Sequence, residues 1–206
     1  ANGKILKNTQ FEKIYISPNP GDAGGSIGSA LLYLDNHKYN IHKDISYAYL
    51  GKKYKNDEIE KILLEKKLTN NFETRKLSED ELIDTVSQEL STSKIVGWFQ
   101  GKMEWGARAL GNRSILADAR NPNIKDIINS KIKRRESFRP FAPSVLEEDV
   151  SNQFEMNAKS PYMLLVAPVK KELCKQMTEE EDKLFGIEKL NIPRSSLPAI
   201  THVDYS

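Results

Sequence analysis

Cysteine and histidine are scarce in this sequence. The 206 residues include one cysteine, Cys174, and three histidines. A single cysteine excludes an internal disulfide, which fits a reducing compartment, so we expect a cytoplasmic protein. Cys174 lies in a run with helical character, where a packing role is favoured over a nucleophilic one. His37 and His42 lie five residues apart in a polar run, which favours solvated side chains over a metal-binding pair.

Long apolar runs are also missing. No stretch approaches the roughly 20 apolar residues that a membrane-spanning helix needs, so no membrane partner is expected. Hydrophobic residues make up 38% of the chain and charged residues 29%, which is typical of a soluble globular protein. The net charge is only +2, which disfavours nucleic acid as a partner.

Positive charge is nevertheless concentrated in one segment. Residues 101–139 contain ten Lys or Arg and four Asp or Glu, a local charge of +6, so the remainder of the chain carries −4. A local positive field inside a near-neutral protein indicates a site for a particular anion rather than a general polyanion surface.

This basic segment opens with a glycine-rich loop. Residues 95–99 (IVGWF) predict a strand, and the loop that follows alternates glycines with cations: Gly101, Lys102, Gly106, Arg108, Gly111 and Arg113. Glycine lets backbone N–H groups approach an anion, and arginine adds paired donors suited to phosphate or carboxylate. Alternatively, the arginines pair with surface acids and the glycines only turn the chain. Composition leaves both interpretations open.

A second glycine-rich stretch lies near the beginning of the chain. Residues 11–17 predict a strand, and PNPGDAGGSIGSALL over 18–32 predicts a turn that opens a helix. Gly21, Gly24 and Gly25 make this turn a candidate phosphate or nucleotide site. The alternative is an ordinary strand-to-helix turn with Asp22 as the N-cap.

Periodicity predicts the remaining elements. Helices are expected over 56–68, 78–90, 121–133 and 171–184, and strands over 46–51, 114–117 and 162–169. Residues 197–203 are expected to lead into a final strand that stops at Ser206. Ser78 and Glu81 form a capping box, and the apolar stripes of these helices are expected to face the core. Two prolines keep residues 138–143 out of a helix, so this segment is expected to be extended and to aim Arg139.

Three strings resemble one enzyme family. GKMEWGARALGNRSILADAR over 101–120, KRRESFRPFAPSVL over 133–146 and PAITHVD over 198–204 resemble the nodulation-protein-U-type O-carbamoyltransferases. Ala107 and Ala119 stand where that family usually has proline. Their presence loosens the loop but removes no charged group.

The resemblance implies a fold of α/β (α+β) class. Residues 1–36 are similar to the last strand, turn and helix of an actin- or sugar-kinase-like ATPase domain, and residues 37–45 would be a linker. Residues 46–206 resemble a YrdC-like domain, a twisted open sheet with flanking helices, here truncated at its end. The chain would then be a fragment without turnover of its own, prone to self-association.

The resemblance also implies a chemistry. ATP and carbamoyl phosphate would form carbamoyl adenylate, whose carbamoyl group passes to a hydroxyl of a small-molecule acceptor. Lys102 and Arg108 match the lysine and arginine that bind carbamoyl phosphate. The positions implied for nucleotide binding are Gly21, Asp22, Gly24, Gly25, Arg113, Arg139 and Ser144.

Asp22 further matches an aspartate that ligates iron in the family. The partner histidines are not in this sequence, and one carboxylate is a poor site for a transition metal. We therefore expect iron or another divalent metal in the amino-terminal domain of a longer protein, and none bound to this chain. A non-catalytic nucleotide- or phosphate-binding module and a YrdC-like RNA-binding domain remain alternatives.

Overall fold

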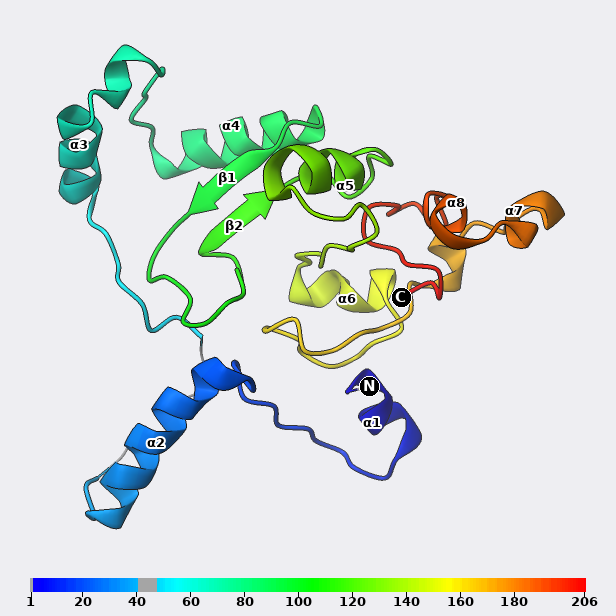
Figure 1. Ribbon diagram of the computed structural model, residues 1–206, viewed down its shortest axis with the longest axis horizontal. Helices are drawn as coiled ribbons and strands as arrows, with labels where there is room; N and C mark the ends of the chain where they lie inside the picture. The colour runs from blue at the N-terminus through cyan, green and yellow to red at the C-terminus, as the bar shows by residue number, and fades with distance from the viewer. Residues whose placement is uncertain (1, 41–47) are drawn as a thin grey trace. The chain divides into compact units, whose positions relative to one another are not determined.

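The computed structural model describes residues 2–40 and 48–206 (Figure 1). These residues divide into two compact units, one of Ala1–Ile14 with Ala117–Ser206 and one of Tyr15–Leu116. Part of the predicted 37–45 linker, including His42, and the start of the predicted strand at 46–51 lie outside the described residues. The proposed domain boundaries stay a prediction.

The unit of Tyr15–Leu116 combines helices with a small sheet. Its helices are α2 (Asp22–Asn36), α3 (Asn56–Glu65), the short 3-10 helix η1 (Leu68–Asn70) and α4 (Glu79–Ser91). Strands β1 (Val96–Phe99) and β2 (Arg113–Leu116) pair antiparallel, with Val96 opposite Leu116 and Phe99 opposite Arg113, and α4 lies beside β1 (Figure 1). The mixed helix-and-sheet composition is confirmed, and within the described residues this two-stranded sheet is the only one.

Helix α4 begins where its capping box predicts. The backbone N–H of Glu81 donates to Ser78 Oγ, and the Ser78 N–H donates to the Glu81 carboxylate at 2.9 Å. The predicted burial of the apolar stripe is wrong in part, because Leu82 is 39% exposed. Val86 and Leu90 are half-buried. Periodicity identifies an apolar face, but the small sheet covers only part of it.

The other unit is mainly helical and irregular. Its elements are α1 (Gly3–Asn8), α5 (Ile124–Ile127), the π-helical turn η2 (Ile128–Lys133), η3 (Glu147–Asp149), α6 (Val150–Gln153), η4 (Lys171–Leu173), α7 (Glu179–Lys183) and α8 (Gly186–Leu190). Its buried apolar residues are Ile124, Ile128, Phe154, Val169 and Ala199. In neither unit is a described helix long and apolar enough to cross a bilayer.

Three predicted strands are wrong. Residues 11–17, residues 162–169 and the final segment that stops at Ser206 form no strand, apart from a single bridge between Val169 and Phe154. An apolar run becomes a strand only when a neighbouring strand takes up its backbone hydrogen bonds. Near the chain's end, the hydroxyls of Ser195 and Thr201 instead form a hydrogen bond of 2.7 Å, which closes a turn.

The predicted helix at 171–184 is also wrong. The N–H of Lys175 donates to the Arg194 carbonyl at 2.7 Å, and the N–H of Ser196 donates to the Leu173 carbonyl at 2.9 Å. These backbone groups therefore pair with a distant segment instead of within a helix. Within 171–184 the structure has only the 3-10 helix η4 and the five-residue helix α7, which starts after a capping box at Thr178.

The helix of α5 and η2 provides a test of this packing. Ile124 is 2% exposed, whereas Ile132, which sequence spacing placed on the same inward face, is 44% exposed. We predict that Ile124→Ala costs about 2–5 kcal/mol of unfolding free energy and Ile132→Ala about 1 kcal/mol or less. Urea unfolding of the two variants measures both costs, and equal costs would contradict the burial described.

Candidate functional site

The glycine-rich loop leaves β1 and returns to β2. Its first arm runs antiparallel to the segment after Ala48: the Gly51 N–H donates to the Met103 carbonyl at 2.9 Å, and the Met103 N–H donates to the Lys52 carbonyl at 3.1 Å. The Trp105 N–H donates to the Ala48 carbonyl at 2.6 Å. The described part of the predicted strand at 46–51 is therefore not a regular strand, but it holds this arm of the loop.

Glycines occupy the bends of the loop. Gly101, Gly106 and Gly111 have φ angles of 58°, 105° and 106°. Residues with a Cβ rarely adopt φ values near 105°. The loop's path consequently depends on glycine at positions 106 and 111, whereas the φ of Gly101 is close to those of Lys38 (57°) and Lys67 (51°).

Glu104 is the buried acid at the centre of the loop. Its Oε1 accepts hydrogen bonds from the backbone N–H groups of Leu110 at 2.6 Å and Asn112 at 2.7 Å. The N–H of Arg113 donates to the same oxygen at 3.2 Å, and Arg113 Nε donates to Oε2 at 3.0 Å. One carboxylate therefore fixes the returning arm of the loop. The sequence analysis missed this role, although Glu104 is the one acid among three cations over 101–113.

These surroundings lower the pKa of Glu104. Burial, the largest influence, opposes ionisation and acts to raise the pKa. The hydrogen bonds from Leu110, Asn112 and Arg113 together outweigh burial and lower the pKa from 4.5 to about 2. Glu104 is ionised at neutral pH as a result.

Arg113 has a structural function in the loop. Besides its bond to Glu104, its Nη2 donates to the Gly106 carbonyl at 3.1 Å. Tyr49 adds a further support, since its hydroxyl donates to the Leu110 carbonyl at 2.8 Å. Burial and then the Glu104 charge raise the Tyr49 pKa, so this hydroxyl keeps its proton. A contact from Arg113 to nucleotide phosphate stays a prediction.

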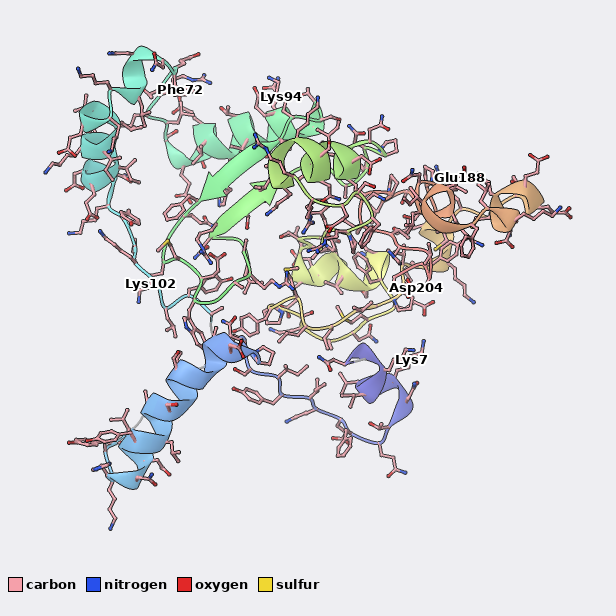
Figure 2. The ribbon with its side chains drawn as sticks, in the orientation of Figure 1. Lys7, Phe72, Lys94, Lys102, Glu188 and Asp204 are labelled. Carbon is pink, nitrogen blue, oxygen red and sulfur yellow. The ribbon has the colours of Figure 1, made fainter. Side chains whose placement is uncertain are left out.

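Lys102 and Arg108 are the loop's exposed cations, and Figure 2 shows Lys102 on the arm that follows β1. Within residues 2–40 and 48–206, no acid lies at ion-pair distance from either side chain. Arg113 already compensates the charge of Glu104. The loop therefore presents about two uncompensated positive charges, which suit a dianion.

The glycine-rich turn before α2 contacts this loop. Asn19 Nδ2 donates to the Trp105 carbonyl, across 86 residues of sequence. The N-cap of α2 is Gly21, and Asp22 is the first helical residue, so the interpretation of Asp22 as the N-cap is wrong by one position. Its exposed carboxylate still lies in the first turn, where the helix dipole favours negative charge.

Arg139 and Ser144 lie in the other unit. Arg139 Nε donates to Glu136 Oε2 at 3.0 Å, and both Arg139 and Ser144 are exposed. The fully buried Asn129 shapes the non-helical segment that carries them, because its Nδ2 donates to the Arg139 carbonyl at 2.9 Å. Its Oδ1 accepts from Arg135 Nε at 2.7 Å. The sequence analysis did not identify Asn129.

A metal site is not assembled in the part of the chain that the structure describes. No three His, Cys, Asp or Glu side chains gather there. Asp22 is exposed, and His37 Nδ1 instead lies 2.8 Å from the Tyr33 carbonyl. The residues present do not fit iron, and a metal in a longer protein stays a prediction.

A glycine-rich loop with two exposed cations, joined to a glycine-rich turn that opens a helix, has the geometry of an anion-binding site. Comparison with known proteins identifies the family of the chain. Residues 87–206 match the family model for the carbamoyltransferase C-terminus, and residues 1–31 match the carbamoyltransferase N-terminus. The chain belongs to the carbamoyltransferase family.

Several relatives match almost the whole chain. An uncharacterized protein of Synechocystis sp. is 50% identical over 211 residues, which cover 100% of this chain and 34% of the relative. Nodulation protein NolO of Bradyrhizobium diazoefficiens is 35% identical over 98% of this chain and 34% of the relative. The 3'-hydroxymethylcephem-O-carbamoyltransferase of Streptomyces clavuligerus is 29% identical (100% and 33% covered). The chain spans about a third of the length of these curated relatives.

The buried carboxylate can be tested through its pH dependence. We predict that Glu104→Gln lowers the unfolding free energy at neutral pH by on the order of 1.5–3 kcal/mol, because charge-assisted hydrogen bonds are lost. The folded-state pKa lies below the unfolded one. The wild-type advantage is therefore complete above about pH 4.5 and is lost as the pH falls through about 2.

Urea unfolding of both proteins between about pH 7 and pH 3 measures this difference. Glu60→Gln, which changes an exposed glutamate of α3, is the matched control and should shift stability by no more than about 0.5 kcal/mol. A Glu104→Gln penalty that does not shrink on acidification would contradict the assignment.

Proposed function

We propose that this chain forms the donor-binding part of an O-carbamoyltransferase, in which Lys102 and Arg108 bind carbamoyl phosphate. The observation that carries the proposal is the charge balance of the loop. The buried Glu104 and the half-buried Arg113 compensate each other's charge, and this leaves the two exposed cations for a ligand. The phosphate group of carbamoyl phosphate is a dianion near neutral pH, so its charge matches theirs.

The chemistry proposed has two stages, formation of carbamoyl adenylate and transfer of its carbamoyl group. Carbamoyl phosphate and one water give phosphate and carbamate, and the carbamate attacks the α-phosphorus of ATP and expels pyrophosphate. A hydroxyl of a small-molecule acceptor then attacks the carbonyl carbon of carbamoyl adenylate, and AMP leaves. The first stage brings several anionic groups together, which requires cations that are already positioned. Arg113, Arg139 and Ser144 are proposed to contact the nucleotide phosphates.

We further propose a domain organisation for the longer enzyme. The turn of Gly21, Asp22, Gly24 and Gly25 would belong to an ATPase-like transfer domain, and the region from residue 46 would belong to a YrdC-like domain that forms the adenylate. The names of the cephem relatives, which contain "O-carbamoyltransferase", support transfer to a hydroxyl group. The chain alone is proposed to lack turnover and to self-associate, and its compartment is proposed to be the cytoplasm.

Pyrophosphate release from ATP tests the proposal in the full-length protein that carries this chain. We predict that release requires carbamoyl phosphate and that Lys102→Ala or Arg108→Ala lowers kcat/KM for carbamoyl phosphate by about 10- to 150-fold. That range corresponds to one charge-assisted contact of about 1.5–3 kcal/mol. Arg108→Lys should have a kcat/KM between those of the wild type and Arg108→Ala, because it keeps the charge and loses the paired donors.

Lys66→Ala is the matched control. Lys66 is an exposed lysine at the end of α3, and its loss should change kcat/KM by less than about twofold. Release that ignores carbamoyl phosphate, or that survives Arg108→Ala, would overturn the proposal and favour a non-catalytic phosphate-binding module. Binding to oligonucleotides with a log-linear salt dependence would instead favour an RNA-binding domain.

A further inference from the structure

Asn19 lies where the two glycine-rich segments meet. Pro18 and Pro20 flank it, so proline rings restrict the backbone on both sides and favour an extended conformation. Asn19 is only 9% exposed, and its amide donates to the carbonyl of Trp105. A short, rigid stretch therefore presents one polar side chain to the loop.

Glycines stand opposite Asn19 on both segments. A Cβ at Gly106 would overlap the Asn19 side-chain oxygen, and a Cβ at Gly24 would overlap the Asn19 carbonyl oxygen. At Gly111 and Gly25, in contrast, a Cβ would meet nothing within 4 Å. Asn19 therefore leaves no room for a side chain at Gly106 and Gly24, whereas Gly111 and Gly25 have room for one.

We propose that Asn19 is a positioning residue that fixes Trp105 and Gly106 and thereby sets the spacing of Lys102 and Arg108. The two cations lie on either side of this dipeptide in the loop, so movement there would change the distance between them. Asn19 contacts no substrate and acts through the loop, and this inference rests on the proposed function. Pre-organisation of both cations would raise affinity for the carbamoyl phosphate dianion.

Steady-state kinetics of Asn19→Ala in the full-length protein test this role. We expect the KM for carbamoyl phosphate to rise about tenfold, the effect of one lost positioning hydrogen bond, while kcat and the KM for ATP change by less than about twofold. A purely structural role would lower the fraction of folded enzyme and hence kcat, with KM unchanged. Asn19→Asp should resemble Asn19→Ala, since it keeps the shape and removes the amide donor.

A matched pair of glycine variants isolates the contact. Gly106 and Gly111 have almost the same φ, 105° and 106°, so Gly106→Ala and Gly111→Ala impose similar backbone strain. Only Gly106→Ala also displaces Asn19, and it should raise KM further. In an Asn19→Ala background the two variants should become equal, because the overlapping side chain is gone. A difference that persists in that background would overturn the inference.

Pyrophosphate release and calorimetric titration with inorganic phosphate together separate this inference from the proposed function. If Arg108→Ala abolishes carbamoyl-phosphate-dependent pyrophosphate release but Asn19→Ala leaves KM unchanged, the inference about Asn19 fails and the proposed function stands. If Arg108→Ala has no effect on release, the proposed function fails. Phosphate affinity then decides the role of Asn19: a loss of about tenfold in Asn19→Ala supports it, and equal affinity overturns it.

Discussion

The ionised carboxylate of Glu104, buried inside a loop of the basic segment, is the interaction on which the candidate site depends. Burial of a charge is costly unless several donors surround it. Here the donors are the backbone N–H groups of Leu110, Asn112 and Arg113 and the guanidinium of Arg113. To bring these groups to one side chain, the backbone must bend repeatedly, and it does so at glycines with positive φ.

The same interaction divides the cations of the loop into two kinds. The half-buried Arg113 balances the charge of Glu104 and is engaged in this ion pair. Lys102 and Arg108 remain exposed, and they are the cations proposed to bind the anion. Composition left open whether the cations of the loop bind an anion or pair with acids. The two interpretations are compatible, because Arg113, which pairs with Glu104, supports the loop that presents Lys102 and Arg108.

Local signals predicted the elements that local interactions stabilise. The capping box at Ser78 set the start of α4, the glycine-rich turn preceded α2, and the short apolar runs before and after the loop became β1 and β2. Runs of similar apolar character at 11–17 and 162–169 formed no strand. The difference lies in the partner strand. Each hydrogen bond of a sheet joins the backbone of two segments, so one apolar run cannot form a strand without a second segment beside it.

The sequence by itself determined the family, the position of the basic glycine-rich loop and the candidate cations, because these depend on residue type and spacing along the chain. Tertiary structure decided the function of each charge. It buried Glu104, engaged Arg113, left Arg108 exposed and brought Asn19 to Trp105, 86 residues away. Burial and hydrogen bonding between distant segments fix such assignments, and neither is encoded in the spacing of neighbouring residues.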